Sequence, residues 1–418
     1  MCIFALCFNQ SCNMKRIITF ALSLCLVATA AVAKPKNKSL VGKQLPAWSE
    51  GYLDIHTISS GRGECLLIVM PDGTSMVIDA GELVFKSKPS KKSKYGMALP
   101  RPNNEVRPVK VYADYIRHFM PFKDAIDYYH LSHFHMDHMG QILKRYKTDE
   151  EGGYLKTGPT ELFHHIPFRE ANDRAYPDYE KWTAQATSVK LLENYRKFLD
   201  YHIAKGDLKA TKFELGATNQ FPLRHKPNAY PNFNIENVCV NGMVWDKAQN
   251  KIINVYNGRT IRENASSCGF VIRYGKFDFF TAGDIGDYYD FECIVAQAVG
   301  KVDAAKANHH LSPHSMVEKT MKALAPQVMS VTSFSNREIQ PDQSKFGFIS
   351  KLGCKMYCTS VGEAMLKEYP KVYKKCRSVS GHVVFRVEPN GERFWVYVLD
   401  DFDSEYRIKL VDGPFKAK

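Results

Sequence analysis

The sequence predicts an α/β protein, because strand-like and helix-like runs both occur along a chain long enough for one large domain. The chain has 418 residues, of which 44% are hydrophobic and 24% are charged, as in ordinary globular proteins. Residues 125–131 are apolar and aromatic without Pro or Gly, which predicts a buried strand. A helix-like run, residues 137–143, follows directly. A strand-to-helix connection is therefore expected between them.

Three histidines and an aspartate lie on this connection in the pattern His-x-His-x-Asp-His. His133 and His135 are two residues apart on extended backbone, so their side chains point the same way. Asp137 and His138 follow on the turn and can face a second point nearby. Imidazole and carboxylate together suit zinc or a similar divalent ion, and two metals roughly 3.5–4 Å apart form a clamp for hydrolysis. Because the pattern is specific, we interpret it as a metal-binding motif, not as a polar loop with scattered histidines.

The remaining elements follow from periodicity and turn residues. Strands are predicted at residues 53–58, 65–70, 75–78, 268–274, 277–281 and 328–332, with a hairpin formed by 381–388 and 392–399. Helices are predicted at residues 112–120, 142–146, 183–204, 288–299 and 316–324. The segment 150–261 is rich in Tyr, Asn, Pro and Lys, and we interpret it as an elaboration that shapes the substrate pocket.

Four features, in this order, resemble the metallo-β-lactamase superfamily. They are Asp79 in Ile-Asp-Ala-Gly, the His133 to His138 motif, Asp284 in Thr-Ala-Gly-Asp, and the His309-His310 pair. The resemblance covers most of residues 53–332 and leaves the long elaboration unmatched.

Within that superfamily, the hydrolase domain of competence DNA-uptake proteins looks most similar. Gly61-Arg62-Gly63-Glu64, followed by Pro-Asp-Gly, resembles the opening of that domain. Asn264-Ala265-Ser266-Ser267 before the Gly-Asp strand, and a His-His pair after Val-Asp, resemble it too.

The resemblance implies a four-layer αβ/βα sandwich, with two mixed β-sheets flanked by helices and the site at one edge between the sheets. It implies a metal site with these ligands: His133 and His135 for a first ion, Asp137, His138 and His310 for a second, and Asp284 as a bridge. Two Zn²⁺ per chain are expected, with Mn²⁺ or Fe as alternatives. Asp79 would orient the histidines. Asp137, Asp284 and His309 are the expected catalytic residues, His309 by stabilising developing negative charge.

One departure concerns the first ion. The family's usual Gly-His-Thr, about twenty residues before the Gly-Asp, is absent, and Asn264 and Ser266 stand there instead. A distant histidine could substitute, and the candidates are His164, His165 and His225. Occupancy by a single metal is the alternative.

The N-terminal segment predicts export. Residues 1–33 fit a signal peptide, with Met14-Lys15-Arg16 as a cationic start (and Met14 as an alternative first residue), an apolar run, and Ala31-Val32-Ala33 before the cleavage point. Residues 34–50 are interpreted as a linker, and 51–418 as a single metallo-β-lactamase-like domain with insertions at about 86–111 and 150–261. A periplasmic or extracellular location is expected, without a transmembrane segment after cleavage.

The charge favours an anionic partner. The chain carries a formal +13, and the part after residue 33 keeps 55 basic against 44 acidic residues, or +11. Residues 86–94 form a loop rich in lysine. We expect a metal-dependent hydrolase of phosphoesters or phosphodiesters, nucleic acid included. The alternatives are a lactone, carboxylic-ester or β-lactam hydrolase, or a non-catalytic metal-binding protein.

The cysteines do not form a disulfide framework. Seven follow residue 33, an odd and scattered set. Either Cys354 or Cys358 could pair with Cys376 in an oxidising compartment.

Overall fold

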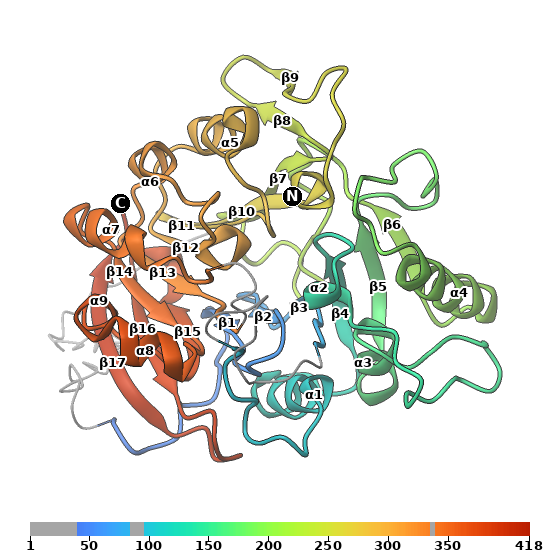
Figure 1. Ribbon diagram of the computed structural model, residues 1–418, viewed down its shortest axis with the longest axis horizontal. Helices are drawn as coiled ribbons and strands as arrows, with labels where there is room; N and C mark the ends of the chain where they lie inside the picture. Colours follow the sequence, from blue (N-terminus) through green and yellow to red (C-terminus); the bar gives the residue numbers. More distant parts are fainter. Residues whose placement is uncertain (1–39, 84–95, 335–338) are drawn as a thin grey trace, which may run out of the picture. The chain divides into compact units, whose positions relative to one another are not determined.

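The computed structural model describes residues 40–83, 96–334 and 339–418, which all belong to one compact unit. The predicted signal peptide and the lysine-rich loop at 86–94 lie outside the described residues. Figure 1 shows two β-sheets with helices on either side. None of the described helices is both long enough and apolar enough to cross a bilayer.

The first sheet has nine strands in the order β17-β16-β15-β1-β2-β3-β4-β5-β6. They are β1 (Leu53–Thr57), β2 (Leu66–Val69), β3 (Ser75–Ile78), β4 (Ile126–Leu131), β5 (Phe168–Asp173), β6 (Lys209–Lys212), β15 (His382–Val387), β16 (Arg393–Leu399) and β17 (Ile408–Lys416). Strands β3 to β6 pair in parallel, and the others pair antiparallel, so the sheet is mixed.

The second sheet has eight strands in the order β14-β13-β12-β11-β10-β7-β8-β9. They are β7 (Phe233–Val240), β8 (Met243–Asp246), β9 (Lys251–Asn254), β10 (Gly269–Tyr274), β11 (Phe277–Thr281), β12 (Ala304–Lys306), β13 (Val328–Val331) and β14 (Lys355–Cys358). Strands β11 to β14 are parallel, and β10, β7, β8 and β9 extend the sheet antiparallel.

Alternating side chains bury both faces of each sheet. In β2, Ile68 belongs to the core between the sheets, whereas Leu67 belongs to the core that also includes residues of helices α1 (Pro108–Phe119), α3 (Pro159–His165) and α4 (Val189–Lys205). In β11, Phe279 lies between the sheets and Phe280 faces the other helices. These are α5 (Phe291–Val299), α6 (Glu318–Leu324), α7 (Phe346–Lys351), α8 (Glu363–Glu368) and α9 (Pro370–Tyr373). The layers run helix–sheet–sheet–helix, which confirms the predicted α/β sandwich with two mixed sheets.

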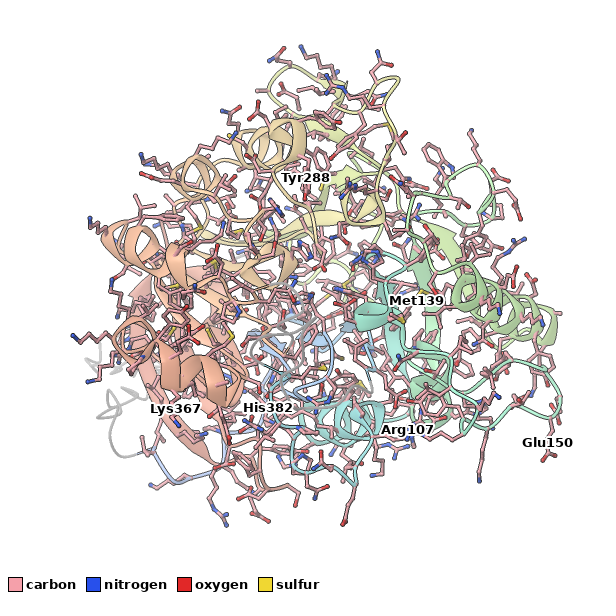
Figure 2. All side chains as sticks on the ribbon, in the orientation of Figure 1. Arg107, Met139, Glu150, Tyr288, Lys367 and His382 are labelled. Carbon is pink, nitrogen blue, oxygen red and sulfur yellow. The ribbon has the colours of Figure 1, made fainter. Side chains whose placement is uncertain are left out.

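The segment 150–261, expected from the sequence to be an insertion, forms part of both sheets. It contributes β5 and β6 to the first sheet and β7 to β9 to the second. Glu150, where the segment begins, is exposed near the edge of the view in Figure 2, whereas β5 is largely buried. The edge strands β6 and β9 are four residues long, and none of their residues is buried, so they lack the alternation of buried apolar and exposed polar residues that marks a strand in a sequence.

The helix predicted over residues 142–146 does not form. Helix α2 (Met136–Met139) ends after one turn, because Gly140 has φ 93, in the left-handed region. A Cβ at Gly140 would lie 2.6 Å from the Thr157 hydroxyl oxygen, so the tight exit needs glycine. The predicted linker also has structure near its end, since Leu45 is buried in the core.

Candidate metal centre

The His133 to His138 motif follows β4, a parallel strand, at its carboxyl end, where binding sites of α/β sheets commonly lie. Backbone hydrogen bonds fix the turn: Glu64 N–H donates to the Asp137 carbonyl at 2.8 Å, and Ala80 N–H donates to the His138 carbonyl at 2.9 Å. Gly81 lies against Asp137 so closely that a Cβ there would be 1.6 Å from the Asp137 carbonyl oxygen. The motif is therefore held by the two segments that flank β2 and β3.

Three donor atoms of the predicted second metal position converge. His138 Nε2 lies 3.1 Å from Asp284 Oδ2, and His310 Nε2 lies 3.2 Å from the same oxygen. Asp137 Oδ2 lies 3.4 Å from His310 Nε2. Ligands bound to one ion at about 2.1 Å are separated by roughly 3.0–3.4 Å in octahedral or tetrahedral geometry, so these distances fit a shared ion.

Two of these nitrogens, and the second carboxylate oxygen of Asp284, lack hydrogen-bond partners among the described residues. They are His138 Nε2, His310 Nε2 and Asp284 Oδ1, and all three are buried. Buried polar atoms are ordinarily satisfied, because an unmet donor or acceptor costs about 1–3 kcal/mol. A divalent ion would satisfy these atoms, so the residues present fit a metal.

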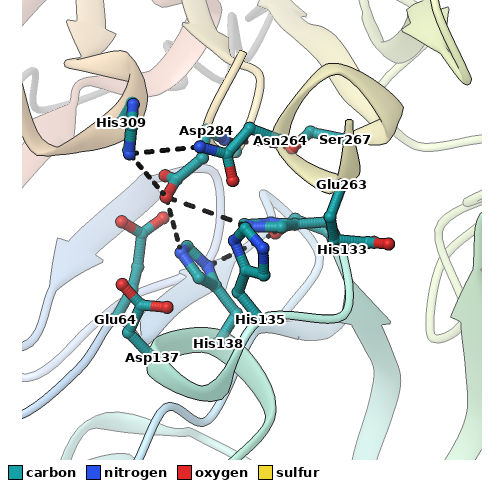
Figure 3. Close-up of polar contacts among 12 residues, drawn as sticks. Glu64, His133, His135, Asp137, His138, Glu263, Asn264, Ser267, Asp284 and His309 are labelled. Carbon is teal, nitrogen blue, oxygen red and sulfur yellow. Dashed lines mark hydrogen bonds and ion pairs between the residues drawn. The ribbon is translucent and has the colours of Figure 1, made fainter. Parts of the chain in front are cut away.

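The first metal position is more open. His133 Nε2 and His135 Nδ1 are 3.2 Å apart, and His133 Nε2 is 3.9 Å from Asp284 Oδ2. The Asp284 carboxylate thus lies between the two groups of histidines, where the predicted bridging ligand should lie (Figure 3). His135 and Asp137 are only half-buried, which places them at the mouth of the site.

Four imidazoles are anchored through Nδ1. The anchors are Asp79 for His138 at 2.7 Å, the Thr332 hydroxyl for His310 at 2.9 Å, the Ser132 hydroxyl for His133 at 3.1 Å, and the Ser312 hydroxyl for His309 at 2.9 Å. An anchored Nδ1 fixes the ring orientation and leaves Nε2 for the centre, as is usual for histidines that bind metals. Asp79 lies where the resemblance placed it.

A buried ion pair behind His310 was not predicted. Lys306 Nζ binds both carboxylate oxygens of Glu64, at 2.8 and 3.0 Å, and the Gly283 carbonyl at 2.9 Å. Glu64 in turn accepts a hydrogen bond from the Thr332 hydroxyl at 2.7 Å. Glu64 lies close enough to His138, Asp284 and His310 to join a metal-binding group. Because Lys306 occupies both of its oxygens, we assign it a supporting position. The only sequence signal was its place in the Gly61–Glu64 segment.

A second unpredicted ion pair supports the first position. Glu263, next to Asn264, binds the Arg174 guanidinium through both oxygens, at 3.0 and 2.7 Å, and both side chains are fully buried. Glu263 also accepts the Phe134 backbone N–H at 2.9 Å. Phe134 lies between His133 and His135, so this pair fixes the strand end that carries them.

Nearby charges set the protonation of the centre. Burial alone would lower the pKa of His310, but the carboxylates of Asp284 and Asp137 raise it to about 9. Burial likewise opposes the charge on His138, and Asp284 and Asp79 hold its pKa well above the usual range. The pKa of His133 is lowered by burial and by His138. An entering cation would therefore displace protons from His138 and His310.

The three distant histidines considered as substitutes lie among other residues. His164 contacts the Tyr154 hydroxyl at 3.0 Å, His165 approaches Glu161, and the ring of His225 packs against Phe122. Asn264, which stands at the position of the missing family histidine, has its Nδ2 3.2 Å from His309 Nε2 (Figure 3). The predicted role of His309 in stabilising charge stays a prediction.

No protein-family model matches the chain, and no curated protein matches it. Among solved structures, it is similar to Zn²⁺-bound PqqB from Methylobacterium extorquens, with a TM-score of 0.35, 12% identity, and coverage of 74% of this chain and 98% of that one. For the metallo-β-lactamase SMB-1 bound to 2-mercaptoethanesulfonate, the TM-score is 0.29 and the identity 13%, with coverage of 64% of this chain and 81% of that one. For the hydrolase AbOPH of the β-lactamase superfamily, the TM-score is 0.28 and the identity 11%, with coverage of 78% of this chain and 91% of that one. These likenesses are distant, and the interpretation of the site rests on its own geometry.

Proposed function

We propose that this chain is a metal-dependent hydrolase of the metallo-β-lactamase type. The observation that carries the proposal is the convergence of two buried imidazoles on one carboxylate oxygen. His138 Nε2 lies 3.1 Å and His310 Nε2 lies 3.2 Å from Asp284 Oδ2. Imidazole nitrogens together with aspartate oxygens are a donor set that suits Zn²⁺, with Mn²⁺ or Fe as alternatives. The two groups of donors around Asp284 support two ions per chain.

Divalent ions at these donors would act as Lewis acids and would lower the pKa of a bound water towards 7. The side chains of the protein would position that water. Asp137, half-buried at the mouth, can accept a hydrogen bond from the attacking water and orient it, with Asp284 beneath. Neither a serine nor a cysteine nucleophile is needed.

We infer a phosphoester or phosphodiester substrate, nucleic acid included. The net charge of +11 after residue 33 favours an anionic partner, and the lysine-rich segment 86–94 adds to it. The resemblance of the Gly61–Glu64 and Asn264–Ser267 segments to DNA-uptake hydrolase domains points the same way.

The purified protein, loaded with zinc or manganese, should hydrolyse bis-p-nitrophenyl phosphate, and His135→Ala should not. His225→Ala is the matched control, because the ring of this histidine packs against Phe122 and belongs to neither proposed metal position. Nitrocefin and a lactone should be tested in parallel, since faster turnover of either would replace the phosphoester assignment. Stoichiometric metal without turnover of any of the three substrates would indicate a binding protein.

We also propose that the protein is exported, from the cationic, apolar and small-residue order of residues 14–33. The mature protein, isolated from cell fractions, should begin at Lys34 by mass spectrometry. An intact N-terminus on the folded protein would contradict export by signal cleavage.

A further inference from the structure

We propose that Glu64 is a positioning residue of the metal centre, and that it acts on His310 through the hydroxyl of Thr332. This inference rests on the proposed function, because it concerns how one ligand of the second metal position is made ready for its ion. Lys306 belongs to the same arrangement, since it forms a buried ion pair with the Glu64 carboxylate.

The hydrogen bonds around Thr332 determine which nitrogen carries the proton when the His310 ring is neutral. The Thr332 hydroxyl lies 2.7 Å from Glu64 Oε2 and donates to it, because an ionised carboxylate only accepts. The same hydroxyl lies 2.9 Å from His310 Nδ1. Its single proton is already directed at Glu64, so it must accept from Nδ1–H. The Thr332 carbonyl, which can only accept, lies 3.1 Å from the same nitrogen. The lone pair of His310 is therefore on Nε2.

The nitrogen that keeps the lone pair is the one that faces the other donors. His310 Nε2 lies 3.2 Å from Asp284 Oδ2 and 3.4 Å from Asp137 Oδ2. It has no hydrogen-bond partner among the residues that the structure describes. A carboxylate behind a histidine fixes the ring and makes it a stronger metal ligand. Glu64 can supply this effect through the Thr332 hydroxyl.

Lys306 keeps Glu64 in the state that this arrangement needs. A buried carboxylate without a positive partner tends to take up a proton, and it could then donate to Thr332 instead of accepting. Lys306 Nζ prevents this by binding both carboxylate oxygens, at 2.8 and 3.0 Å. It also donates to the Gly283 carbonyl at 2.9 Å, directly before Asp284 in the chain. One ammonium group thus holds the carboxylate behind His310 and the backbone that carries Asp284.

The test is zinc affinity in variants of residues that are not ligands in this proposal: Thr332→Val, Thr332→Ser and Glu64→Gln. Each protein would be equilibrated with zinc at free concentrations set by a competing chelator, and bound zinc measured by elemental analysis. Thr57→Val is the matched control, because Thr57 is a buried threonine whose hydroxyl donates to Ser330 Oγ at 2.9 Å. Circular dichroism verifies that each variant folds, and urea unfolding measures its stability.

We expect Thr332→Val and Glu64→Gln to bind one of the two ions about 10–100-fold more weakly than the wild type, the range typical of changes to groups behind the ligands. Thr332→Ser and Thr57→Val should bind zinc as the wild type does. Valine resembles threonine in shape, so a role in packing alone would leave zinc affinity unchanged in Thr332→Val. Serine restores the hydroxyl without the methyl group, so its rescue identifies the hydrogen bonds as the cause.

Wild-type affinity in Thr332→Val, or equal weakness in Thr332→Val and Thr332→Ser, would overturn the proposal. Complete loss of one ion in Glu64→Gln, with a smaller effect in Thr332→Val, would also overturn it, because Glu64 would then be a ligand itself. A wild-type chain that takes no zinc would instead overturn the proposed function.

Discussion

Glu263 accepts the backbone N–H of Phe134 at 2.9 Å, from a segment more than a hundred residues away. The guanidinium of Arg174 binds Glu263 and lies 4.2 Å from the centre of the Phe134 ring. The residue between the two histidines of the first metal position is thus held through its backbone and through its ring.

Glu263→Gln should destabilise the protein strongly. The substitution removes the negative charge that pairs with the Arg174 guanidinium, and the Arg174 side chain is fully buried. A buried charge left without its partner costs about 3–5 kcal/mol of stability. Urea unfolding followed by circular dichroism measures this loss. Glu180→Gln is the control, because Glu180 pairs with Arg196 in an exposed position and should unfold as the wild type does. Equal stability of the two variants would contradict the assigned role of Glu263.

Gly81→Ala should disturb the His133 to His138 turn. The new Cβ would lie 1.6 Å from the Asp137 carbonyl oxygen, and backbone atoms cannot move aside as a flexible side chain can. We expect a loss of about 3 kcal/mol, the upper end for overpacking, together with weaker zinc binding. Thermal unfolding and zinc titration would show both effects.

Gly347→Ala provides the opposite control. Gly347 lies in α7, and the nearest atom to a new Cβ would be 3.8 Å away. Alanine should therefore stabilise the helix by about 0.5–1 kcal/mol. A similar loss of stability in both glycine variants would contradict a specific contact at Gly81.

Glu292 should make stability depend on pH. Burial raises the pKa of Glu292 from its ordinary 4.5 to about 7, although the carboxylate accepts hydrogen bonds from the Asn308 amide and the Met316 backbone N–H. Between these pKa values the folded state keeps a proton that the unfolded state releases. Stability from this residue is therefore full below pH 4.5 and is lost as pH rises to 7.

Glu292→Gln removes this dependence. As pH rises from 5 to 8, the unfolding free energy of the variant should increase by roughly 2 to 3 kcal/mol relative to that of the wild type. Denaturant unfolding at the two pH values measures the difference, and Glu318→Gln, an exposed glutamate, is the control. Parallel pH dependence in Glu292→Gln and the wild type would contradict the raised pKa.

Cys358 and Cys376 should form a disulfide when the protein is exposed to an oxidant. Their sulfur atoms lie 3.8 Å apart, whereas the sequence left Cys354 and Cys358 as equal candidates for pairing with Cys376. The bond would close a loop across 18 positions and stabilise the protein by about 3 kcal/mol. Peptide mapping without reductant should find this pair, with Cys354 as a free thiol. A Cys354–Cys376 peptide would contradict the prediction.

The metal-binding motif was predictable because its four side chains lie within six consecutive residues. The spacing of His133 and His135 on extended backbone already implied a common direction. Residues that act from behind the centre were not predictable. Lys306 ends β12 and Thr332 follows the neighbouring strand β13, and only the packing of this sheet against the first brings both residues to Glu64.

The turn at His309 and His310 shows the same limit. Nothing in the sequence indicated that these two neighbouring imidazoles could face one carboxylate, that of Asp284. In a strand or helix, neighbouring side chains diverge, and it is the left-handed turn that brings these two together. The edge strands β6 and β9 were also missed, since short, exposed edge strands lack a periodic signal.

The donors around Asp284 come from both sheets: the His133 to His138 turn follows β4 in one, and Asp284 and His310 follow β11 and β12 in the other. A bound cation would consequently cross-link the two sheets of the sandwich. Removal of the cation by a chelator should therefore destabilise the contact between the two sheets first. Amide hydrogen exchange should become faster at the carboxyl ends of β4 and β12 before it becomes faster in the outer helices.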